Sequence, residues 1–156
     1  MTNEIIKNEM VSDNETLTEK FFSNKGRIGR MTYFQRSLAV LGIKFLLAFI
    51  IGTGCYIMSD AANAEMYVKT VIAVIALVGL IPQYFLDTKR LHDIGKDETL
   101  AKVFIGVGIL EIICTFSIVG IVAGIANAAS VVSLVFTLYL LFMKGEEVTN
   151  EYGIAK

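Results

Sequence analysis

The chain has 156 residues, enough for one domain, and its formal net charge of −1 excludes a strongly basic nucleic-acid-binding protein. Hydrophobic residues make up 54% of it and charged residues 19%, against roughly 45–50% and about 25% in soluble globular domains. Almost all of the charge lies at 1–36, 87–102 and 144–156, so the stretches between carry nearly none. This distribution predicts an integral membrane protein.

The first 20 residues differ from the rest of the chain. They are polar and mixed in charge, with too few apolar side chains to bury, so we predict a disordered cytoplasmic tail at 1–20. The membrane domain is expected to follow at 21–153.

Three apolar stretches predict four transmembrane helices. Ser37–Met58 and Thr70–Leu86 each suit one crossing of about 30 Å of hydrocarbon, whereas Val103–Met143 is too long for one crossing and suits two. The hairpin of this third stretch is placed near Ala126–Ala129, in its least hydrophobic part. The predicted fold is an all-α, four-transmembrane-helix bundle, with helices at about 33–58, 70–93, 98–125 and 129–143.

The orientation of these helices follows from the basic residues near the membrane, which favour the cytoplasmic side. One side has only Lys69 in the loop between the first two helices. Both termini are therefore predicted to be cytoplasmic (N-in, C-in), on the side that carries Lys20, Lys25, Arg27, Arg30, Arg36, Lys89, Arg90, Lys96, Lys102 and Lys144.

Cys55 and Cys114 both lie inside apolar runs, far apart in the sequence. A metal site or redox motif needs closely spaced thiols or nearby histidines, and His92 is the only histidine. We therefore expect no metal and no cofactor, and interpret the two cysteines as small packing residues.

Three polar motifs converge on the predicted cytoplasmic face: GRIGR at 26–30, KRLHDIGK at 89–96 and NEYG at 150–153. Arginines and glycines just before a helix N-terminus can hold a phosphate, or they can simply follow the positive-inside bias. Gly95 is expected to end the second helix. The candidate polar cluster consists of Arg27, Arg30, Arg90, His92, Asp93, Asn150 and Tyr152.

The pair His92 and Asp93 invites an acid–base interpretation, because imidazole titrates near neutral pH. Adjacent residues on a helix point in different directions, however, and no second histidine or nucleophile motif accompanies the pair. We favour a structural network that ties this loop to the N-terminal arginines, and we do not expect an enzyme.

Two ionisable residues stand inside the predicted membrane helices, Lys44 and Glu111. Such residues are costly in a bilayer and are functional hypotheses by default. Both lie about 10–12 Å from the cytoplasmic end at 1.5 Å per residue, so an ion pair between them is predicted. In the alternative, Lys44 extends toward the headgroups and Glu111 is protonated.

With these residues placed, the chain resembles the domain-of-unknown-function 805 (DUF805) family of small bacterial inner-membrane proteins. The similarity rests on GRIGRMTYF before the first helix, on KRLHDIGK after the second and on NEYG after the last. The family's Ser-Gly-Trp-Trp after the loop is replaced here by DETL. The resemblance implies a multi-pass protein of the bacterial inner (plasma) membrane and implies no activity.

The leading hypothesis is a non-enzymatic membrane component whose cytoplasmic motifs bind anionic phospholipid headgroups or a protein partner, with homo-oligomers as a further form of association. The alternative is a small transporter or channel component that uses Lys44 and Glu111. A membrane enzyme acting on a lipid-linked phosphate through His92 is the weakest interpretation.

Overall fold

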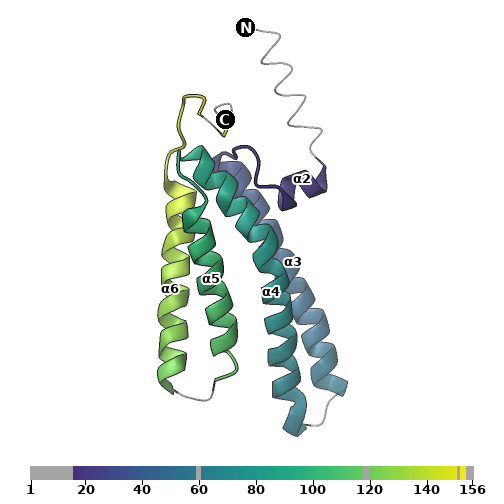
Figure 1. Cartoon of the computed structure of the whole chain (residues 1–156). Coiled ribbons are helices and arrows are strands. Elements are labelled where there is room, and N and C mark those ends of the chain that lie inside the picture. Colours follow the sequence, from purple (N-terminus) through teal and green to yellow (C-terminus); the bar gives the residue numbers. More distant parts are fainter. Residues whose placement is uncertain (1–15, 59–60, 118–119, 151, 154–156) are drawn as a thin grey trace.

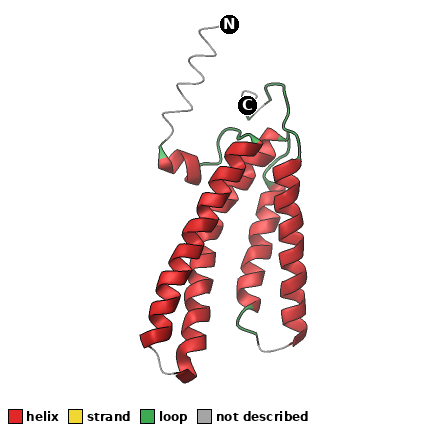
Figure 2. Ribbon diagram, turned by 180° about the vertical axis from the view of Figure 1, so that it is seen from behind, coloured by secondary structure: helices red, strands yellow, loops and turns green. Residues whose placement is uncertain are grey.

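The structure is a computed structural model that describes residues 16–58, 61–117, 120–150 and 152–153. The described chain is all-α, as predicted, with its helices in the order α2 (Leu17–Phe22), α3 (Arg30–Met58), α4 (Ala61–Asp93), α5 (Thr99–Cys114) and α6 (Gly120–Phe142). The long helices run roughly along one direction, α3 beside α4 and α5 beside α6 (Figures 1 and 2). Helix α2 lies at the end of the bundle where the segment after α6 also lies (Figure 1).

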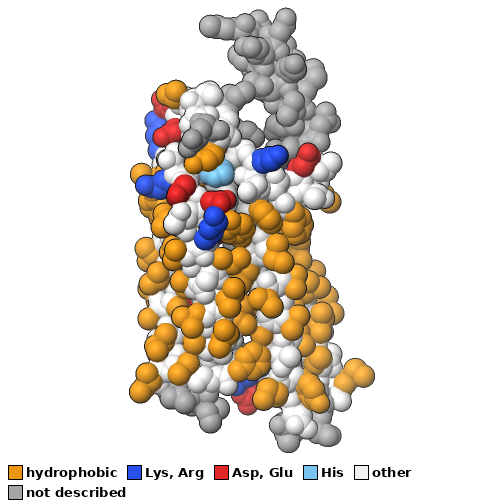
Figure 3. All heavy atoms as spheres, viewed as in Figure 1, with side chains coloured by type: hydrophobic (Ala, Val, Ile, Leu, Met, Phe, Trp, Pro, Cys, Tyr) orange, Lys and Arg blue, Asp and Glu red, His pale blue; other side chains and the backbone are white. Residues whose placement is uncertain are grey.

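Three helical segments are long and apolar enough to cross a membrane: Arg30–Met58, Asn63–Asp93 and Gly124–Phe142. Only 11% to 17% of the residues in their most apolar windows are buried, so their side chains face outward as lipid-facing side chains do. The apolar side chains form a broad belt, and most charged side chains gather at one end of it (Figure 3). The chain is therefore a multi-pass membrane protein. Helix α5 has 16 residues, about 24 Å by the rise per residue, and the fourth crossing remains a prediction.

The hairpin of the third apolar stretch lies earlier than predicted. Helix α5 ends at Cys114, and α6 begins at Gly120 and continues through Ala126–Ala129 without a break. The backbone of Ser117 donates to Cys114 O at 3.0 Å, which tightens the chain into a turn after α5. Placing the turn at Ala126–Ala129 was wrong because alanine, although only weakly hydrophobic, is the best helix former.

The predicted disordered tail also needs correction. Its residues 1–15 lie outside the described residues, but Leu17 to Lys20 belong to α2. Thr16 and Glu19 form a capping box in which Thr16 Oγ1 accepts from Glu19 N at 3.2 Å and Glu19 Oε2 accepts from Thr16 N at 2.8 Å. These bonds satisfy backbone donors at the helix start, and Phe21 packs against the buried core.

The C-terminal end of α2 is held by two cationic side chains of the long helices. The Lys89 ammonium of α4 donates to Glu19 O, and Arg36 Nη1 of α3 donates to Lys20 O at 3.4 Å. Cations suit the carbonyl end of a helix, where the last carbonyls have no helical partner. Helix α2 is thereby docked on α3 and α4.

Helix α4 ends as predicted, at Asp93, and Gly95 follows with φ +76°. Lys96 N donates to Leu91 O at 2.9 Å and Gly95 N donates to His92 O at 3.2 Å, which is the bonding pattern of a Schellman motif. Glycine suits this position because it adopts a positive φ without strain. The turn fixes where the polar residues of the last turn of α4 lie.

The buried apolar core sits mainly at the same end of the bundle as α2. Several of its side chains belong to the segments that carry the polar motifs, rather than to the middle of the helices. The members of the core are Ile28, Tyr33, Val40, Leu86, Leu91, Ile94, Ala101, Phe136 and Leu140. Part of the buried apolar core therefore lies in the same segments as the predicted polar cluster.

Candidate functional site

The segment before α3 is brought against α4 by a backbone contact. Gly26 has φ +90°, a conformation that favours glycine, and Ile28 N then donates to Lys89 O at 3.3 Å. On α4, Arg90 and Asp93 are three residues apart and so lie on one face of its last turn. Arg27, Arg90 and Asp93, with the carbonyl oxygens that the two arginines bind, form what we call the arginine clasp.

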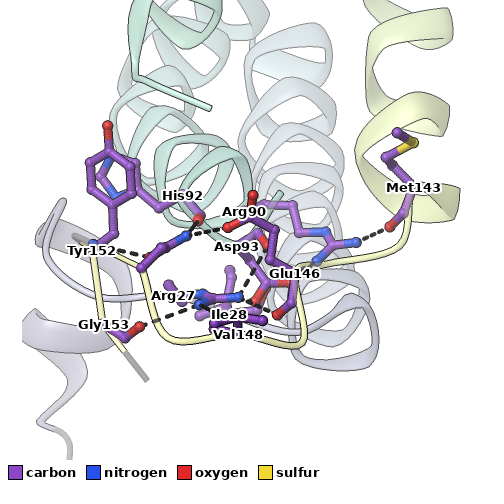
Figure 4. A network of polar contacts seen from close by, with 11 residues as sticks. Arg27, Ile28, Arg90, His92, Asp93, Met143, Glu146, Val148, Tyr152 and Gly153 are labelled. Atoms are coloured by element: carbon purple, nitrogen blue, oxygen red, sulfur yellow. Dashed lines mark hydrogen bonds and ion pairs between the residues drawn. The ribbon is translucent and has the colours of Figure 1, made fainter. Parts of the chain in front are cut away.

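Arg27 is buried, with 2% of its surface exposed. Its Nε donates to Asp93 Oδ1 at 3.3 Å and its Nη2 donates to Asp93 O at 3.3 Å. The other bonds reach the segment after α6: Nη2 to Glu146 O at 2.6 Å, and Nη1 to Val148 O at 2.8 Å and Gly153 O at 3.3 Å. One guanidinium thus joins the N-terminal segment, α4 and the C-terminal segment (Figure 4).

Arg90 is fully buried and binds a second set of carbonyls. Its Nε donates to Leu140 O at 2.8 Å, within α6, and its Nη2 donates to Met143 O just beyond the helix. Its Nη1 donates to Ile28 O at 3.4 Å and to the Asp93 carboxylate. Arg90 therefore holds the end of α6 against α4 and supplies partners for the last carbonyls of that helix.

Asp93 is the shared acceptor of the clasp and is 1% exposed. Its carboxylate forms ion pairs with Arg27 and Arg90, and its backbone oxygen accepts from Glu146 N at 2.8 Å. A Cβ at Gly145 would lie 2.1 Å from Asp93 Oδ2, so the glycine allows the C-terminal segment to approach. Both charges of each pair are removed from water, and each is paired and hydrogen-bonded as burial requires.

The NEYG motif closes over the end of α4. Asn150 Nδ2 donates to His92 O at 3.0 Å and to Glu146 Oε2 at 2.8 Å, while Asn150 Oδ1 accepts from Tyr152 N at 3.0 Å. The rings of His92 and Tyr152 stack with 3.9 Å between their centroids and 5° between their planes. The imidazole is 7% exposed, and this ring covers one of its faces.

Six of the seven residues of the predicted polar cluster are thus brought together, and Arg30 is not among them. Arg30 is exposed on the first turn of α3. Arg27 and Arg90 direct their N–H groups to protein acceptors. The arrangement fastens three segments of the chain to one another.

The predicted ion pair between Lys44 and Glu111 is not formed. The aliphatic part of the Lys44 side chain lies over Gly79 of α4, where a Cβ would meet its Cδ at 2.3 Å. Glu111 instead faces α6, and its Oε1 accepts from Ser133 Oγ at 2.9 Å. Each of the two lines a different pocket.

The sequence interpretation missed a polar group just inside the clasp. Asp87 is buried and its Oδ1 accepts from Tyr33 Oη at 2.9 Å and from Gln83 Nε2 at 2.7 Å. The four-residue spacing of Gln83 and Asp87 was a usable signal, because such pairs meet on a helix. Tyr33 lies on another helix and gave no such signal.

The described helices enclose a larger and a smaller pocket. The larger, about 560 Å³, is bounded by α2, α3 and α4 and is lined almost wholly by apolar side chains together with Lys44. The smaller, about 140 Å³, lies between α4, α5 and α6 and includes Asp87 and Glu111. Among the described residues, no group of three or more His, Cys, Asp or Glu side chains lies close enough to hold a metal ion.

Comparison with known protein families gives a match. A family described as "Protein of unknown function (DUF805)" matches residues 21–154, which include the described helices from α3 to α6 and all three polar motifs. No curated protein and no solved structure matches the chain.

Proposed function

The chain belongs to the DUF805 family. We propose that it is a non-enzymatic, multi-pass protein of the bacterial inner membrane that binds an anionic phospholipid between α2, α3 and α4. The observation that carries this proposal is the apolar groove of about 560 Å³ beneath α2, with a single lysine in its wall. Ligand sites of roughly 300–1,000 Å³ with predominantly apolar linings are usual in proteins.

The proposal includes four crossings with both termini in the cytoplasm. Helix α5, although short, runs beside α6, and the chain turns directly after Cys114. The clasp end of the bundle carries Lys25, Arg30 and Lys96 at exposed positions, whereas Lys69 lies near the start of α4, at the other end. This asymmetry supports a cytoplasmic clasp.

Helix α2 supports a lipid site at that surface. It lies across the end of the bundle, and the side chains of Leu17 and Phe22 are 75% and 53% exposed while also lining the groove. Apolar side chains at the membrane surface insert between headgroups and acyl chains. The exposed Lys25 and Arg30 follow α2 in the sequence and suit an anionic headgroup.

Lys44 gives the groove its selectivity for an anionic lipid. It is half-buried among apolar side chains that include Val40 and Leu47, and no hydrogen bond or ion pair of its ammonium group with another described residue is present. An unpaired ammonium is costly in an apolar setting, and a phosphate or another anion on the ligand removes that cost. An acyl chain in the groove with its headgroup toward Lys44 satisfies both the apolar walls and the charge.

The clasp has a supporting role in this proposal. Arg27 and Arg90 fix the ends of α4 and α6 instead of binding headgroups themselves, which leaves Arg30 as the exposed arginine of the GRIGR motif. His92 is covered by Tyr152, which supports a structural role over a catalytic one.

Native mass spectrometry of the detergent-extracted protein tests the proposal, with phosphatidylglycerol and phosphatidylcholine offered in equal amounts. We expect the wild type to retain phosphatidylglycerol. Lys44→Met should lose the preference for it, and Val78→Trp should lose lipid altogether because Val78 lines the groove. The matched controls are Lys69→Met and Val135→Trp, an exposed cation and an exposed apolar residue outside the groove.

Equal retention of the two lipids by the wild type, or unchanged retention in both groove variants, contradicts a specific anionic-lipid site. A protein that copurifies in place of lipid would favour the partner-binding form of the sequence hypothesis. Proton-dependent flux that required Lys44 would instead favour the transporter.

A further inference from the structure

The smaller pocket, between α4, α5 and α6, has several polar side chains in a mainly apolar lining within the membrane domain. It extends along α5 from Ala101 to Glu111, about 15 Å at 1.5 Å per residue, with a volume of about 140 Å³. Since roughly 10–15 Å³ holds one water molecule, the pocket has room for several. The polar side chains in its wall are Gln83, Asp87, Glu111, Ser133 and Thr137.

Asp87 lies at the end of the pocket nearest the clasp. It is 9% exposed, and its two hydrogen-bond donors, Tyr33 Oη and Gln83 Nε2, are both neutral. Within the described ranges no lysine or arginine forms an ion pair with this carboxyl group, unlike Asp93 one and a half turns later. A buried carboxylate without a cation is costly, so binding a proton is favourable there.

Glu111 lies at the other end of the pocket, one turn before α5 ends. It is about 18 Å along the helix from Thr99, which is near the middle of a hydrocarbon layer of about 30 Å. Its hydrogen-bond partner is neutral too, because Ser133 Oγ donates to it at 2.9 Å. An unpaired carboxylate at this depth is costly, which marks Glu111 as a functional candidate.

We propose that this pocket is a proton pathway that connects Glu111 with the clasp end of the bundle through Asp87. The carboxylate of Glu111 binds a proton given up by a hydronium ion or by the carboxylic acid of Asp87, and returns it along the same path. Water in the pocket, with the side chains of Gln83 and Ser133 along its wall, bridges the distance between the two carboxyl groups. The ligand of the site is thus the proton.

A metal cation fits this lining less well. The two carboxyl groups lie near opposite ends of the pocket and cannot bind one ion together. The hydroxyl and amide groups nearest to them donate hydrogen bonds to the carboxylates, whereas a hard cation needs several oxygen ligands that converge on one point.

Few other titratable groups face the two carboxyl groups. Helix α4 contributes Tyr84 to the pocket wall and α3 contributes Tyr33 at Asp87. Helix α6 contributes only the hydroxyls of Ser133 and Thr137 among its polar groups, and α5 contributes Glu111 itself. A pH-dependent signal from the pocket therefore has to come from Asp87 or Glu111.

Infrared difference spectroscopy of the full chain in lipid vesicles tests the pathway. Spectra between two pH values should contain a carbonyl band of a protonated carboxyl group that is lost in Glu111→Gln. A band that belongs to Asp87 is distinguished from it because it is lost in Asp87→Asn instead. Ser133→Ala should shift the band, because the hydrogen bond to Glu111 is lost. Glu65→Gln is the control, since Glu65 is an exposed carboxylate paired with Lys69 at the other end of α4.

The path itself is tested by the rate at which deuterium replaces the proton of this band after transfer to heavy water. Asp87→Asn keeps the acceptor for Tyr33 but cannot pass a proton, so exchange should slow by about 100-fold or more, the lower range for a positioned proton-transfer group. The proposal is overturned if no carbonyl band is lost in Glu111→Gln. It is equally overturned if Glu111 titrates but exchanges as fast in Asp87→Asn as in the wild type.

Discussion

Replacing Arg27 with alanine should release the segment after α6 and leave the membrane helices folded. Three of the five hydrogen bonds of this guanidinium reach carbonyl oxygens of that segment, those of Glu146, Val148 and Gly153. Without them the segment keeps its contacts through Asn150 and Tyr152, but it loses the group that joins it to both α4 and the N-terminal segment.

The size of the effect follows from burial. Removing one partner of a buried ion pair costs about 3–5 kcal/mol, because the other charge is left unpaired. Asp93 retains Arg90 in this variant, so we expect the lower value, about 3 kcal/mol. At 1.36 kcal/mol per factor of ten, the open population of the segment should rise by roughly 100-fold.

Hydrogen exchange with mass spectrometry, on the detergent-solubilised protein, measures this population. The amide of Glu146 donates to Asp93 O and that of Gly153 donates to Asn150 O, so both are protected in the clasp. Arg27→Lys should give an intermediate increase, since one ammonium keeps the charge but cannot reach Asp93 and the carbonyls together.

Lys25→Ala is the matched control, because it removes an exposed cation two residues away. Exchange at 144–153 that is unchanged in Arg27→Ala, or that rises equally in Lys25→Ala, would refute the reasoning. Loss of protection throughout the helices would show that the clasp holds the whole bundle and not this segment alone.

Three further changes probe the same end of the molecule. Gly145→Ala should lower the free energy of unfolding by about 1–3 kcal/mol through overpacking, because its Cβ would meet Asp93 at 2.1 Å. Gly124→Ala is the control and should not lower it, because a Cβ there has nothing within 4 Å. Thermal unfolding, followed by thiol labelling of the buried Cys114, compares the two variants. Tyr152→Ala should cost about 0.5–1.5 kcal/mol through the lost stack on His92, and Tyr152→Phe less, by the same assay. The backbone hydrogen bond from Thr16 lowers the pKa of Glu19, so the capping contribution to α2 is present above the pKa of an unfolded glutamate and is lost as the pH falls through the lowered value. A spin label at Thr18 should therefore become more mobile as the pH falls over that range, and Glu19→Gln, which has no titrating carboxylate, should abolish the pH dependence.

The sequence predicted the members of the clasp better than its bonds. Arg90 and Asp93 share a helix face by spacing alone, and the GRIGR and NEYG motifs fall on the same side of the membrane by topology. Most acceptors of the two arginines, however, are backbone carbonyls such as those of Leu140 and Val148, and a carbonyl oxygen is present at every residue. Side-chain identity therefore cannot reveal which carbonyls an arginine will bind.

The ion pair that was predicted for Lys44 and Glu111 failed for a different reason. Equal depth in the membrane fixes a residue's position along its helix but not the direction in which its side chain points. Lys44 faces α4 and Glu111 faces α6, so matched depths brought no contact. The order of the helices around the bundle decides whether Lys44 and Glu111 can meet. Short loops restrict this order but do not determine it.

The position of the clasp follows from the way membrane helices associate. Lipid tails are as apolar as the side chains of α3 and α6, so burying those side chains supplies no hydrophobic drive between helices, and packing and hydrogen bonds must supply specificity. In the described chain most buried charged side chains, including Arg27, Arg90 and Asp93, lie at one end, where water and headgroups can hydrate them before the bundle forms. Placing the costly polar contacts there fixes the order of the helices without moving an uncompensated charge into hydrocarbon. The same arrangement leaves the interior free for the few polar groups, Asp87 and Glu111 among them, that the clasp does not use.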